Sequence, residues 1–371
     1  MRLVQPSSSA PPALTSLDGG TLHSVLRQYD AGEPLSCEPV SQGLLNRGYR
    51  LATTRGRYFL KHHLDAVADR ADPAGPARIE RQHRATDRLG ALGLPVVPAV
   101  SAPGGRTVVV DDGRCYALHP WIEGRHRHGA ELSTAQSCSL GTLLGQIHTR
   151  LAQVIPAASP GIEPGTVPPG SPGSAAYEGA DPAATYELIG ELLTRVRGRR
   201  RRDCFDELAE HRLLERRGLL RRYAGCRPPA VRESFTGWVH GDFHPLNLLY
   251  PAAGSDEAPV AILDWDRLGV QPRAEEAVRA AAIFFLRPSG ALDLRKVRAY
   301  ARAYRRSAGA SPEELGAAVH RVWWERLNDF WMLRWRYQLR DVRADPQFPA
   351  QAALVVWWSS RYEAVRGAFC G

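Results

Sequence analysis

Two polar motifs, each joined to a short apolar strand, constrain this chain more than any other feature. The first is HGDFHPLN at residues 240–247, which leads into the apolar strand LLY. The second is DWD at residues 264–266, which closes the apolar run VAIL. Together they supply three oxygen-bearing side chains in a fixed order, Asp242, Asn247 and Asp264. The competing interpretation is a polar β-hairpin whose acids are simply hydrated.

Phosphoryl transfer from ATP calls for this kind of oxygen set. The protein supplies little covalent chemistry, but it needs a carboxylate that orients the attacking hydroxyl and oxygen ligands that hold Mg²⁺ on the phosphates. The order and spacing of the two motifs match the HRD-x-x-x-x-N and DFG elements of kinases. On this interpretation Asp242 is the catalytic base, Asn247 is a metal ligand and Asp264 is the principal metal ligand.

HGDFHPLNLLY followed by ILDWD resembles the signature of the aminoglycoside phosphotransferase/choline kinase superfamily, the small-molecule branch of the kinase fold. The resemblance covers roughly residues 38–290. It implies an α+β, bilobal protein-kinase-like fold with a small antiparallel β N-lobe that contains one helix and a larger, mostly helical C-lobe. It also implies ATP and Mg²⁺ as cofactors and a small-molecule hydroxyl group as the phosphoryl acceptor.

The resemblance further implies a nucleotide site in the N-lobe. GLLNRGY at residues 43–49 resembles the nucleotide loop, YFLK at 58–61 resembles the strand that bears the ATP lysine, and residues 116–124 resemble the hinge beside adenine. The cofactor-binding residues implied by these matches are Asn46, Gly48, Lys61, His119 and Trp121.

Lys61 has independent support from composition. Of the 48 basic residues, 46 are arginines and only two, Lys61 and Lys296, are lysines. A lysine at a strand end is therefore a candidate for a position that needs a compact ammonium, because the planar guanidinium group of arginine is not interchangeable with it. The alternative is that lysine stands at position 61 by chance. Glu80, on the following helix, is the expected ion-pair partner of this lysine, as in the kinase lysine–glutamate pair, unless it is a solvated helix residue.

Two regions depart from the family pattern. The segment RLGVQPRAEEAV after Asp264 lacks the usual Gly-Asp-Pro and the later aspartate, and has Gln271-Pro272 and Glu275-Glu276 instead. The last ~80 residues match no substrate-binding pattern that carries over. The acceptor therefore cannot be named from the resemblance.

Patterning along the chain predicts three parts: a tail with a lead-in helix at residues 1–35, a nucleotide-binding N-lobe at 36–120, and a catalytic and acceptor-binding C-lobe at 121–371. The N-lobe pattern is a set of short strands with one inserted helix over residues 77–92. Apolar spacing places four residues on one face of that helix: Ile79, Gln82, Thr86 and Leu89. The C-lobe is interrupted by a Pro/Gly-rich loop at residues 155–180. Three or four helices are expected after residue 292.

The segment VWWERLNDFWMLRWRYQL at residues 322–339 is expected to be one helix with an aromatic, core-facing stripe. Glu325 and Asp329 form a like-charge pair on it, which favours a cation between them: Arg326, Arg336 or the substrate. The substrate candidates are Glu325, Asp329 and Trp331. Residues 321–371 hold five acids, eight arginines and six tryptophans, which predicts a neutral, zwitterionic or singly charged acceptor rather than a polycation.

Charge and cysteine usage exclude several classes of protein. The net charge of +9 is concentrated in residues 195–222, which hold eleven arginines against five acids. Nucleic-acid binding is disfavoured there because acids are interleaved and no aromatic stacking pattern accompanies the arginines; a solvated helical insert is favoured. There is no apolar run long enough to span a membrane, and the six cysteines form no metal-binding or CxxC pattern, which predicts a cytoplasmic protein.

The sequence therefore predicts an ATP-dependent phosphotransferase that moves the γ-phosphate to a hydroxyl of an amino sugar, a nucleoside, or another antibiotic or metabolite, with antibiotic resistance or self-protection as a candidate role. Two alternatives stay open: a catalytically silent kinase fold that binds a ligand, and a true aminoglycoside kinase. A protein kinase is disfavoured by HGD in place of HRD and by the missing Ala-Pro-Glu segment.

Overall fold

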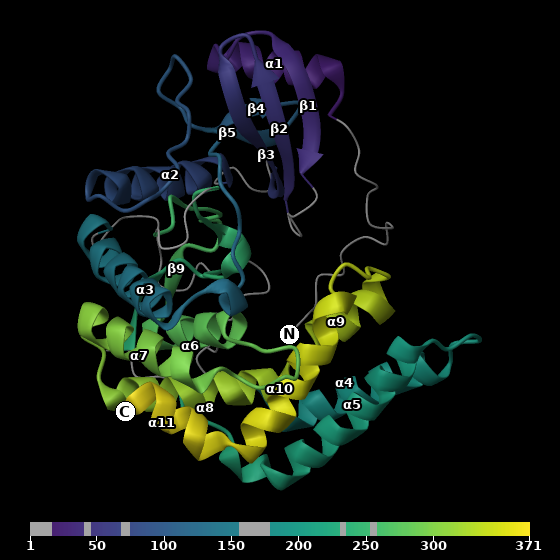
Figure 1. The fold of residues 1–371 in the computed structure, drawn as a ribbon. Helices are drawn as coiled ribbons and strands as arrows, with labels where there is room; N and C mark the ends of the chain where they lie inside the picture. The colour runs from purple at the N-terminus through teal and green to yellow at the C-terminus, as the bar shows by residue number, and fades with distance from the viewer. Residues whose placement is uncertain (1–16, 41–45, 68–74, 156–178, 231–234, 253–257) are drawn as a thin grey trace.

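The computed structural model describes residues 17–40, 46–67, 75–155, 179–230, 235–252 and 258–371. A small sheet forms one lobe and a larger helical assembly forms the other (Figure 1). The predicted α+β, two-lobed arrangement is confirmed. The predicted N-terminal tail up to residue 16, residues 43–45 of the predicted nucleotide loop and most of the predicted 155–180 loop lie outside the described residues.

The N-lobe is an antiparallel sheet with the strand order β1-β2-β3-β5-β4. Its strands are β1 (Pro34–Val40), β2 (Arg47–Thr53), β3 (Gly56–Val67), β4 (Val109–Asp111) and β5 (Arg114–Pro120). Side chains alternate across β2, where Leu51 is buried and its neighbour Arg50 is exposed, as expected for a sheet with one covered face. Leu60 of β3 and Leu118 of β5 are fully buried at the centre.

Two helices complete this lobe, α1 (Gly19–Tyr29) and α2 (Gly75–Ala91). The side chain of Asp18 accepts a hydrogen bond from the Thr21 N–H and so caps α1. The Tyr29 hydroxyl donates to the Tyr116 carbonyl oxygen at 2.9 Å, which fastens α1 to β5. The predicted buried face of α2 is confirmed, because four residues on it are buried: Ile79, Gln82, Thr86 and Leu89.

The C-lobe is a helical bundle with two small strand pairs at its boundary with the sheet. Its helices are α3 (Thr134–Val154), α4 (Pro182–Arg197), α5 (Cys204–Arg222), α6 (Arg273–Phe284), α7 (Leu294–Ala308), α8 (Pro312–Asn328), α9 (Trp331–Arg334), α10 (Phe348–Ser360) and α11 (Tyr362–Cys370). The strand pairs are β6 (Thr236–Val239) with β9 (Gly269–Pro272), and β7 (Leu248–Leu249) with β8 (Ala261–Ile262). No described helix is long and apolar enough to cross a membrane, and all six cysteines are free.

Two expectations for the C-terminal part are wrong. The described stretch from residue 258 onward contains five helices after Leu292, not three or four. The tryptophan-rich segment is not one helix: α8 ends at Asn328, α9 begins at Trp331, and residues 335–339 form a π-helical turn. The reason is Asp329, whose backbone is extended and whose carboxylate accepts the Trp331 N–H at 2.9 Å, a local bond that competes with helix continuation.

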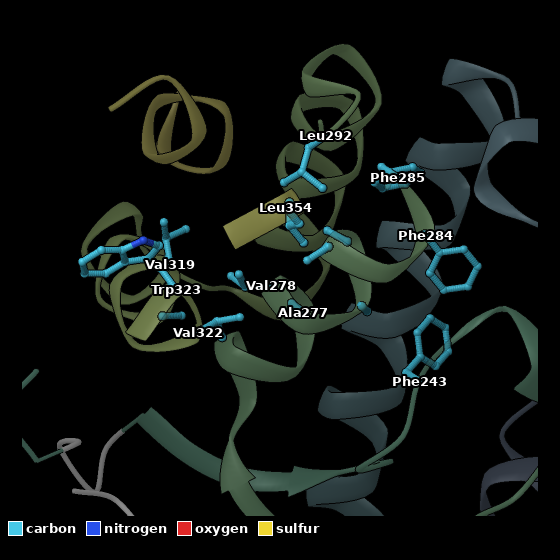
Figure 2. Packing of buried hydrophobic residues seen from close by; sticks show 14 of the residues in the cluster. Phe243, Ala277, Val278, Phe284, Phe285, Leu292, Val319, Val322, Trp323 and Leu354 are labelled. Carbon is cyan, nitrogen blue, oxygen red and sulfur yellow. The ribbon is translucent and has the colours of Figure 1, made fainter. Parts of the chain in front are cut away.

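The main core lies in the C-lobe and reaches the first polar motif. Figure 2 shows the Phe243 ring beside that of Phe284, at the edge of the drawn part of the buried cluster. Phe243 is 3% exposed, and its ring lies 6.1 Å from the ring of Phe284 on α6. The residue directly after Asp242 is therefore anchored in the bundle, which limits the movement of the loop that carries Asp242.

Helices α3 and α7 pack closely because glycines of α3 face the α7 backbone. A Cβ atom at Gly141 would lie 2.2 Å from the Tyr300 carbonyl oxygen, and one at Gly145 would lie 2.6 Å from Ser307 Cβ. Real Cβ atoms do not approach a backbone atom so closely, so any larger residue at Gly141 must push the helices apart.

We expect Gly141→Ala to lower the free energy of unfolding by about 2 kcal/mol or more, because overpacking outweighs the helix propensity of alanine. The matched control is Gly190→Ala on α4, where a Cβ atom meets nothing within 4 Å. That change should raise the free energy of unfolding by about 0.5–1 kcal/mol. Urea denaturation measures both variants. Equal stabilisation by the two alanines would contradict the close approach of α3 and α7.

Candidate active site

The loop that carries Asp242 leaves β6 through a glycine that no other residue can replace without strain. Gly241 has φ +86°, and a Cβ atom on it would lie 2.2 Å from the Arg267 carbonyl oxygen. The loop therefore lies directly against the segment that follows Asp264. His240, just before it, donates from Nε2 to the Leu263 carbonyl oxygen at 2.9 Å and accepts the Asp242 N–H on Nδ1 at 3.2 Å.

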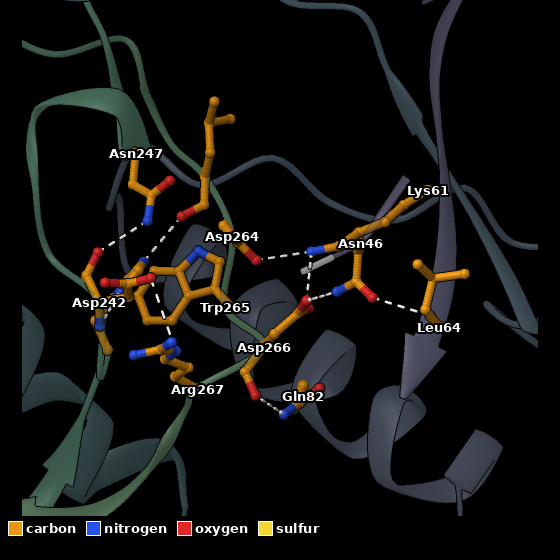
Figure 3. Close-up of polar contacts among 12 residues, drawn as sticks. Asn46, Lys61, Leu64, Gln82, Asp242, Asn247, Asp264, Trp265, Asp266 and Arg267 are labelled. Carbon is orange, nitrogen blue, oxygen red and sulfur yellow. Dashed lines mark hydrogen bonds and ion pairs between the residues drawn. The ribbon is translucent and has the colours of Figure 1, made fainter. Parts of the chain in front are cut away.

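Asp242 and Asn247 are held together in this loop, as the motif predicts. The Asn247 side-chain amide donates to the Asp242 carbonyl oxygen at 2.8 Å (Figure 3). Residues 245–247 form a 3₁₀ turn, and His244 Nδ1 accepts the Leu246 N–H at its start. His244 therefore helps to order the loop.

The carboxylate of Asp242 is partly exposed and faces two basic side chains. His244 Nε2 lies 3.6 Å from one carboxylate oxygen and Arg267 Nε lies 3.8 Å from the other. Burial alone would raise the pKa of Asp242, but the hydrogen bond and charge of His244, with the charges of Arg267 and His240, lower that pKa below its usual value. Asp242 is therefore an ionised carboxylate at neutral pH.

Lys61 on β3 reaches the second motif across the two lobes. Its Nζ lies 2.7 Å from Asp264 Oδ1 and 2.7 Å from Asp266 Oδ2 (Figure 3). Burial alone would lower the pKa of Lys61, but the two carboxylates raise it above its usual range. Asp264 has φ +58°, an uncommon conformation for a residue with a side chain, which turns the chain sharply at the end of the strand. The site thus holds an ammonium and two carboxylates at the boundary between the lobes.

Asp266 is a functional candidate that our sequence analysis did not single out. Besides Lys61, its carboxylate accepts a hydrogen bond from Asn46 Nδ2 at 2.5 Å, and its carbonyl oxygen accepts one from Gln82 Nε2 at 2.9 Å. Burial would raise its pKa, but Lys61 lowers that pKa below the usual value. The sequence feature that could have identified Asp266 is its place as the second acid of the DWD motif, two residues after Asp264.

The predicted ion pair between Lys61 and Glu80 is wrong. Both residues are described, and the ion pairs of Lys61 are those with Asp264 and Asp266. The physical reason is the position of α2, which places Gln82 rather than Glu80 against the DWD segment. Two carboxylates at 2.7 Å already satisfy the ammonium.

The predicted hinge residues continue β5. His119 lies opposite Phe59 in the β3–β5 ladder, and the Trp121 N–H donates to the Arg57 carbonyl oxygen at 3.0 Å. Burial and the charge of Lys61 lower the pKa of His119 to about 4, so its ring is neutral at neutral pH. The Arg50 guanidinium lies over the Trp121 ring at 4.9 Å.

Gly48 lies opposite Lys61 in the β2–β3 ladder, so the predicted nucleotide strand and the lysine strand are paired. A Cβ atom at Gly48 would approach the Phe59 ring to 2.7 Å. The neighbouring Asn46 is the residue of the predicted nucleotide loop that reaches the DWD motif.

The departure from the family pattern after Asp264 contains a second residue that our sequence analysis missed. Glu276, in the first turn of α6, is buried and accepts the backbone N–H of His240 at 3.1 Å and that of Gly241 at 2.5 Å. An acidic side chain next to a motif that lacks its usual aspartate was the signal for it. Glu276 therefore holds the backbone of the catalytic loop.

The three substrate candidates lie at the end of α8 and the start of α9. Glu325 is bound by Arg279 of α6 at 2.9 Å, a cation outside the expected set, while the charge of Arg326, one of the expected cations, acts on both Glu325 and Asp329. Burial raises the pKa of Asp329, and the nearby Glu325 adds to the effect. The Trp331 ring stacks edge-on against Trp335 at 5.2 Å. No hydrogen bond or ion pair among the described residues joins the three candidates to Asp242.

The arginine-rich segment is partly neutralised by nearby acids. Ion pairs among the described residues bind five of its eleven arginines: Arg195 to Glu191, Arg197 and Arg202 to Glu210, Arg199 to Asp206, and Arg212 to Glu215. This arrangement agrees with a solvated helical insert. The ion pairs do not test nucleic-acid binding, so its absence stays a prediction.

In the part of the chain that the structure describes, no group of three or more His, Cys, Asp or Glu side chains is arranged to hold a metal ion. This does not conflict with Mg²⁺ carried by phosphates, since that ion is usually bound through one or two carboxylates plus substrate oxygens and waters.

Comparison with known proteins agrees with this geometry. The sequence model of the phosphotransferase enzyme family matches residues 36–310. The search of curated proteins found no match to the chain.

Solved structures of similar fold include three phosphotransferases or kinases. An aminoglycoside phosphotransferase from Alicyclobacillus acidocaldarius is 15% identical, with a TM-score of 0.55 and coverage of 100% of this chain and 97% of that one. A spectinomycin phosphotransferase in complex with ADP and spectinomycin is 13% identical, with a TM-score of 0.58 and coverage of 94% and 99%. A microcompartment-associated aminopropanol kinase is 18% identical, with a TM-score of 0.57 and coverage of 95% and 99%. At these identities the likeness concerns the fold.

Proposed function

The chain belongs to the phosphotransferase enzyme family, and from that premise we propose that it transfers the terminal phosphoryl group of ATP to a hydroxyl group of a small molecule. The observation that carries the proposal is the ion-pair contact of Lys61 with Asp264 and Asp266, next to the loop that holds Asp242 and Asn247. Asp242 would orient the acceptor hydroxyl and take its proton, a role that requires the ionised carboxylate that its lowered pKa provides.

The remaining residues fit a magnesium nucleotide by the chemistry of their donors. Asp264, with Asn247, offers the oxygen ligands that Mg²⁺ prefers, and Lys61 offers a compact cation for the α- and β-phosphates. When bound, Mg²⁺ neutralises charge on the phosphates. His119 and Trp121, with Asn46 and Gly48, would line the nucleotide on the N-lobe side.

A catalytically silent, ligand-binding kinase fold is the alternative in another class. The retention of Lys61, Asp242, Asn247 and Asp264 together argues against it. An acceptor screen distinguishes the two: ADP release from ATP is followed across aminoglycosides, amino sugars, nucleoside antibiotics and choline-like alcohols. An acceptor-dependent rate that disappears in Asp242→Asn supports the enzyme. Nucleotide binding without ADP release from any acceptor supports the silent protein.

We expect Asp242→Asn to keep its affinity for MgATP and to lose turnover, because Asp242 acts on the acceptor rather than on the nucleotide. Asp264→Asn should lose both, because it removes the principal metal ligand; asparagine is chosen there since it tolerates φ +58°. Calorimetric titration with MgATP and ADP release measure the two properties. Near-normal turnover of Asp242→Asn would show that another group is the base.

Lys61→Arg should not be conservative. The larger guanidinium fork does not fit where one ammonium contacts two carboxylates at 2.7 Å each. A misplacement of the phosphates near 1 Å would reduce kcat/KM for ATP by roughly 10²-fold. The control is Lys296→Arg, since Lys296, the chain's other lysine, donates to the carbonyl oxygens of Gly129 and Ala130 away from the site. Equal kcat/KM values for the two variants would remove Lys61 from the nucleotide site.

We expect the acceptor to be neutral, zwitterionic or singly charged. Each unpaired cation is costly to desolvate, so a polycationic acceptor needs several available carboxylates. Glu325 is already bound by Arg279, which leaves Asp329 for one ammonium, with Trp331 beside it. Kinetics with kanamycin-like and gentamicin-like compounds test this expectation. Micromolar KM values that weaken steeply with added salt would overturn it.

A further inference from the structure

A buried chain of hydrogen bonds runs from α7 through α3 to α6 and ends on the catalytic loop. Tyr304 on α7 is 1% exposed, and its hydroxyl lies 3.1 Å from Nδ1 of His148 on α3, which is fully buried. The other ring nitrogen of His148, Nε2, lies 2.7 Å from Oε2 of Glu276. The same carboxylate accepts the N–H groups of His240 and Gly241.

The charge on Glu276 fixes the direction of the bonds that end on its carboxylate. Burial would raise the pKa of Glu276, but the hydrogen bond and charge of His148 lower it, so the carboxylate is ionised and can only accept. Nε2 of His148 must therefore carry a proton. Nδ1 bonds to the Tyr304 hydroxyl, which can donate or accept and keeps its proton because burial raises the pKa of Tyr304 far above its usual value.

Glu276, the last member of this series of hydrogen bonds, binds the backbone next to Asp242. Gly241 directly precedes Asp242, and its backbone lies close against Arg267, because a Cβ atom on it would lie 2.2 Å from the Arg267 carbonyl oxygen. A rotation of the Glu276 carboxylate would release both N–H groups at once. Because buried N–H groups need partners, the loop would have to move with it.

We propose that His148 and Tyr304 are positioning residues. They fix the orientation of the Glu276 carboxylate, which in turn holds the loop that carries Asp242 in place. The effect on catalysis rests on the proposed function; the effect on the loop does not. The competing interpretation is that His148 only satisfies a buried acid within the core. The two differ in what happens to the loop when the donor to Glu276 is removed while the core volume is kept.

Two matched pairs of variants test this. His148→Met fills the ring volume without a donor, whereas His148→Gln retains an N–H donor at a similar reach. Tyr304→Phe removes the hydroxyl that contacts His148. Tyr300→Phe removes the hydroxyl of an equally buried tyrosine on the same helix, which has no hydrogen-bond partner among the described residues.

The first measurement is deuterium uptake by the peptide that spans residues 238–243, in the full-length protein without any substrate. Uptake by this peptide should become roughly tenfold faster in His148→Met and measurably faster in Tyr304→Phe, with His148→Gln and Tyr300→Phe close to wild type. The second is ADP release from MgATP, with water or an acceptor from the screen. We expect kcat to fall roughly 10–10²-fold in His148→Met, with KM for ATP unchanged and with recovery in His148→Gln.

Wild-type exchange in both His148→Met and Tyr304→Phe would overturn the proposal. So would equal effects of Tyr304→Phe and Tyr300→Phe, because the hydroxyl at His148 would then have no special role. Absence of ADP release from the wild-type protein would count against the proposed function, and the exchange measurement would still decide the role of His148. If His148→Met does not fold, the comparison of the two tyrosine variants decides it.

Discussion

The ammonium of Lys61 between Asp264 and Asp266 is the contact that sets the relation between the two lobes. Its three charged groups come from β3 and from the turn after β8, so the interaction exists only when the sheet and the helical lobe meet correctly. Loss of one carboxylate would leave the nearly buried Lys61 ammonium with less compensation, although Asp264 itself is half exposed. Asn46 adds a hydrogen bond to the Asp266 carboxylate and Gln82 adds one to the Asp266 carbonyl oxygen. The lobes are therefore joined by polar contacts that are also the candidate chemistry.

The sequence analysis proposed the residues of the candidate site more successfully than it proposed which residues form ion pairs with one another. Asp242, Asn247 and Asp264 were proposed from their spacing along short strands, and Lys61 from the resemblance and from the scarcity of lysine; the structure brings Lys61 and Asp264 into contact. The pairing of Lys61 with Asp266 rather than Glu80 depends on where α2 packs, which no local pattern contains. Likewise, strand and helix periodicities predicted a strand-rich first part and a helical remainder, and the family resemblance implied the two lobes. The break at Asp329 arises from a side-chain bond to the Trp331 backbone that competes with an otherwise continuous helical pattern.

Buried polar groups explain much of the order in the helical lobe. The catalytic loop is secured from three directions: by the Phe243 ring in the apolar core, by the His240 ring on the strand before Asp264, and by the Glu276 carboxylate on its N–H groups. Each restraint acts on a different atom type, namely carbon, imidazole nitrogen and backbone nitrogen. Such a loop has few alternative conformations, as preorganised charge stabilisation requires.

Two adjacent glutamates on helix α6 bind different partners. Glu276 holds the catalytic loop, while Glu275 binds Arg279 and Arg321, and Arg279 in turn binds Glu325 on α8. One helical turn thus holds the loop that carries Asp242 and, through Arg279, also binds Glu325. A small rotation of α6 about its axis would displace both together. On the proposed function, a change in the acceptor-binding residues would therefore also be felt by the loop that carries Asp242.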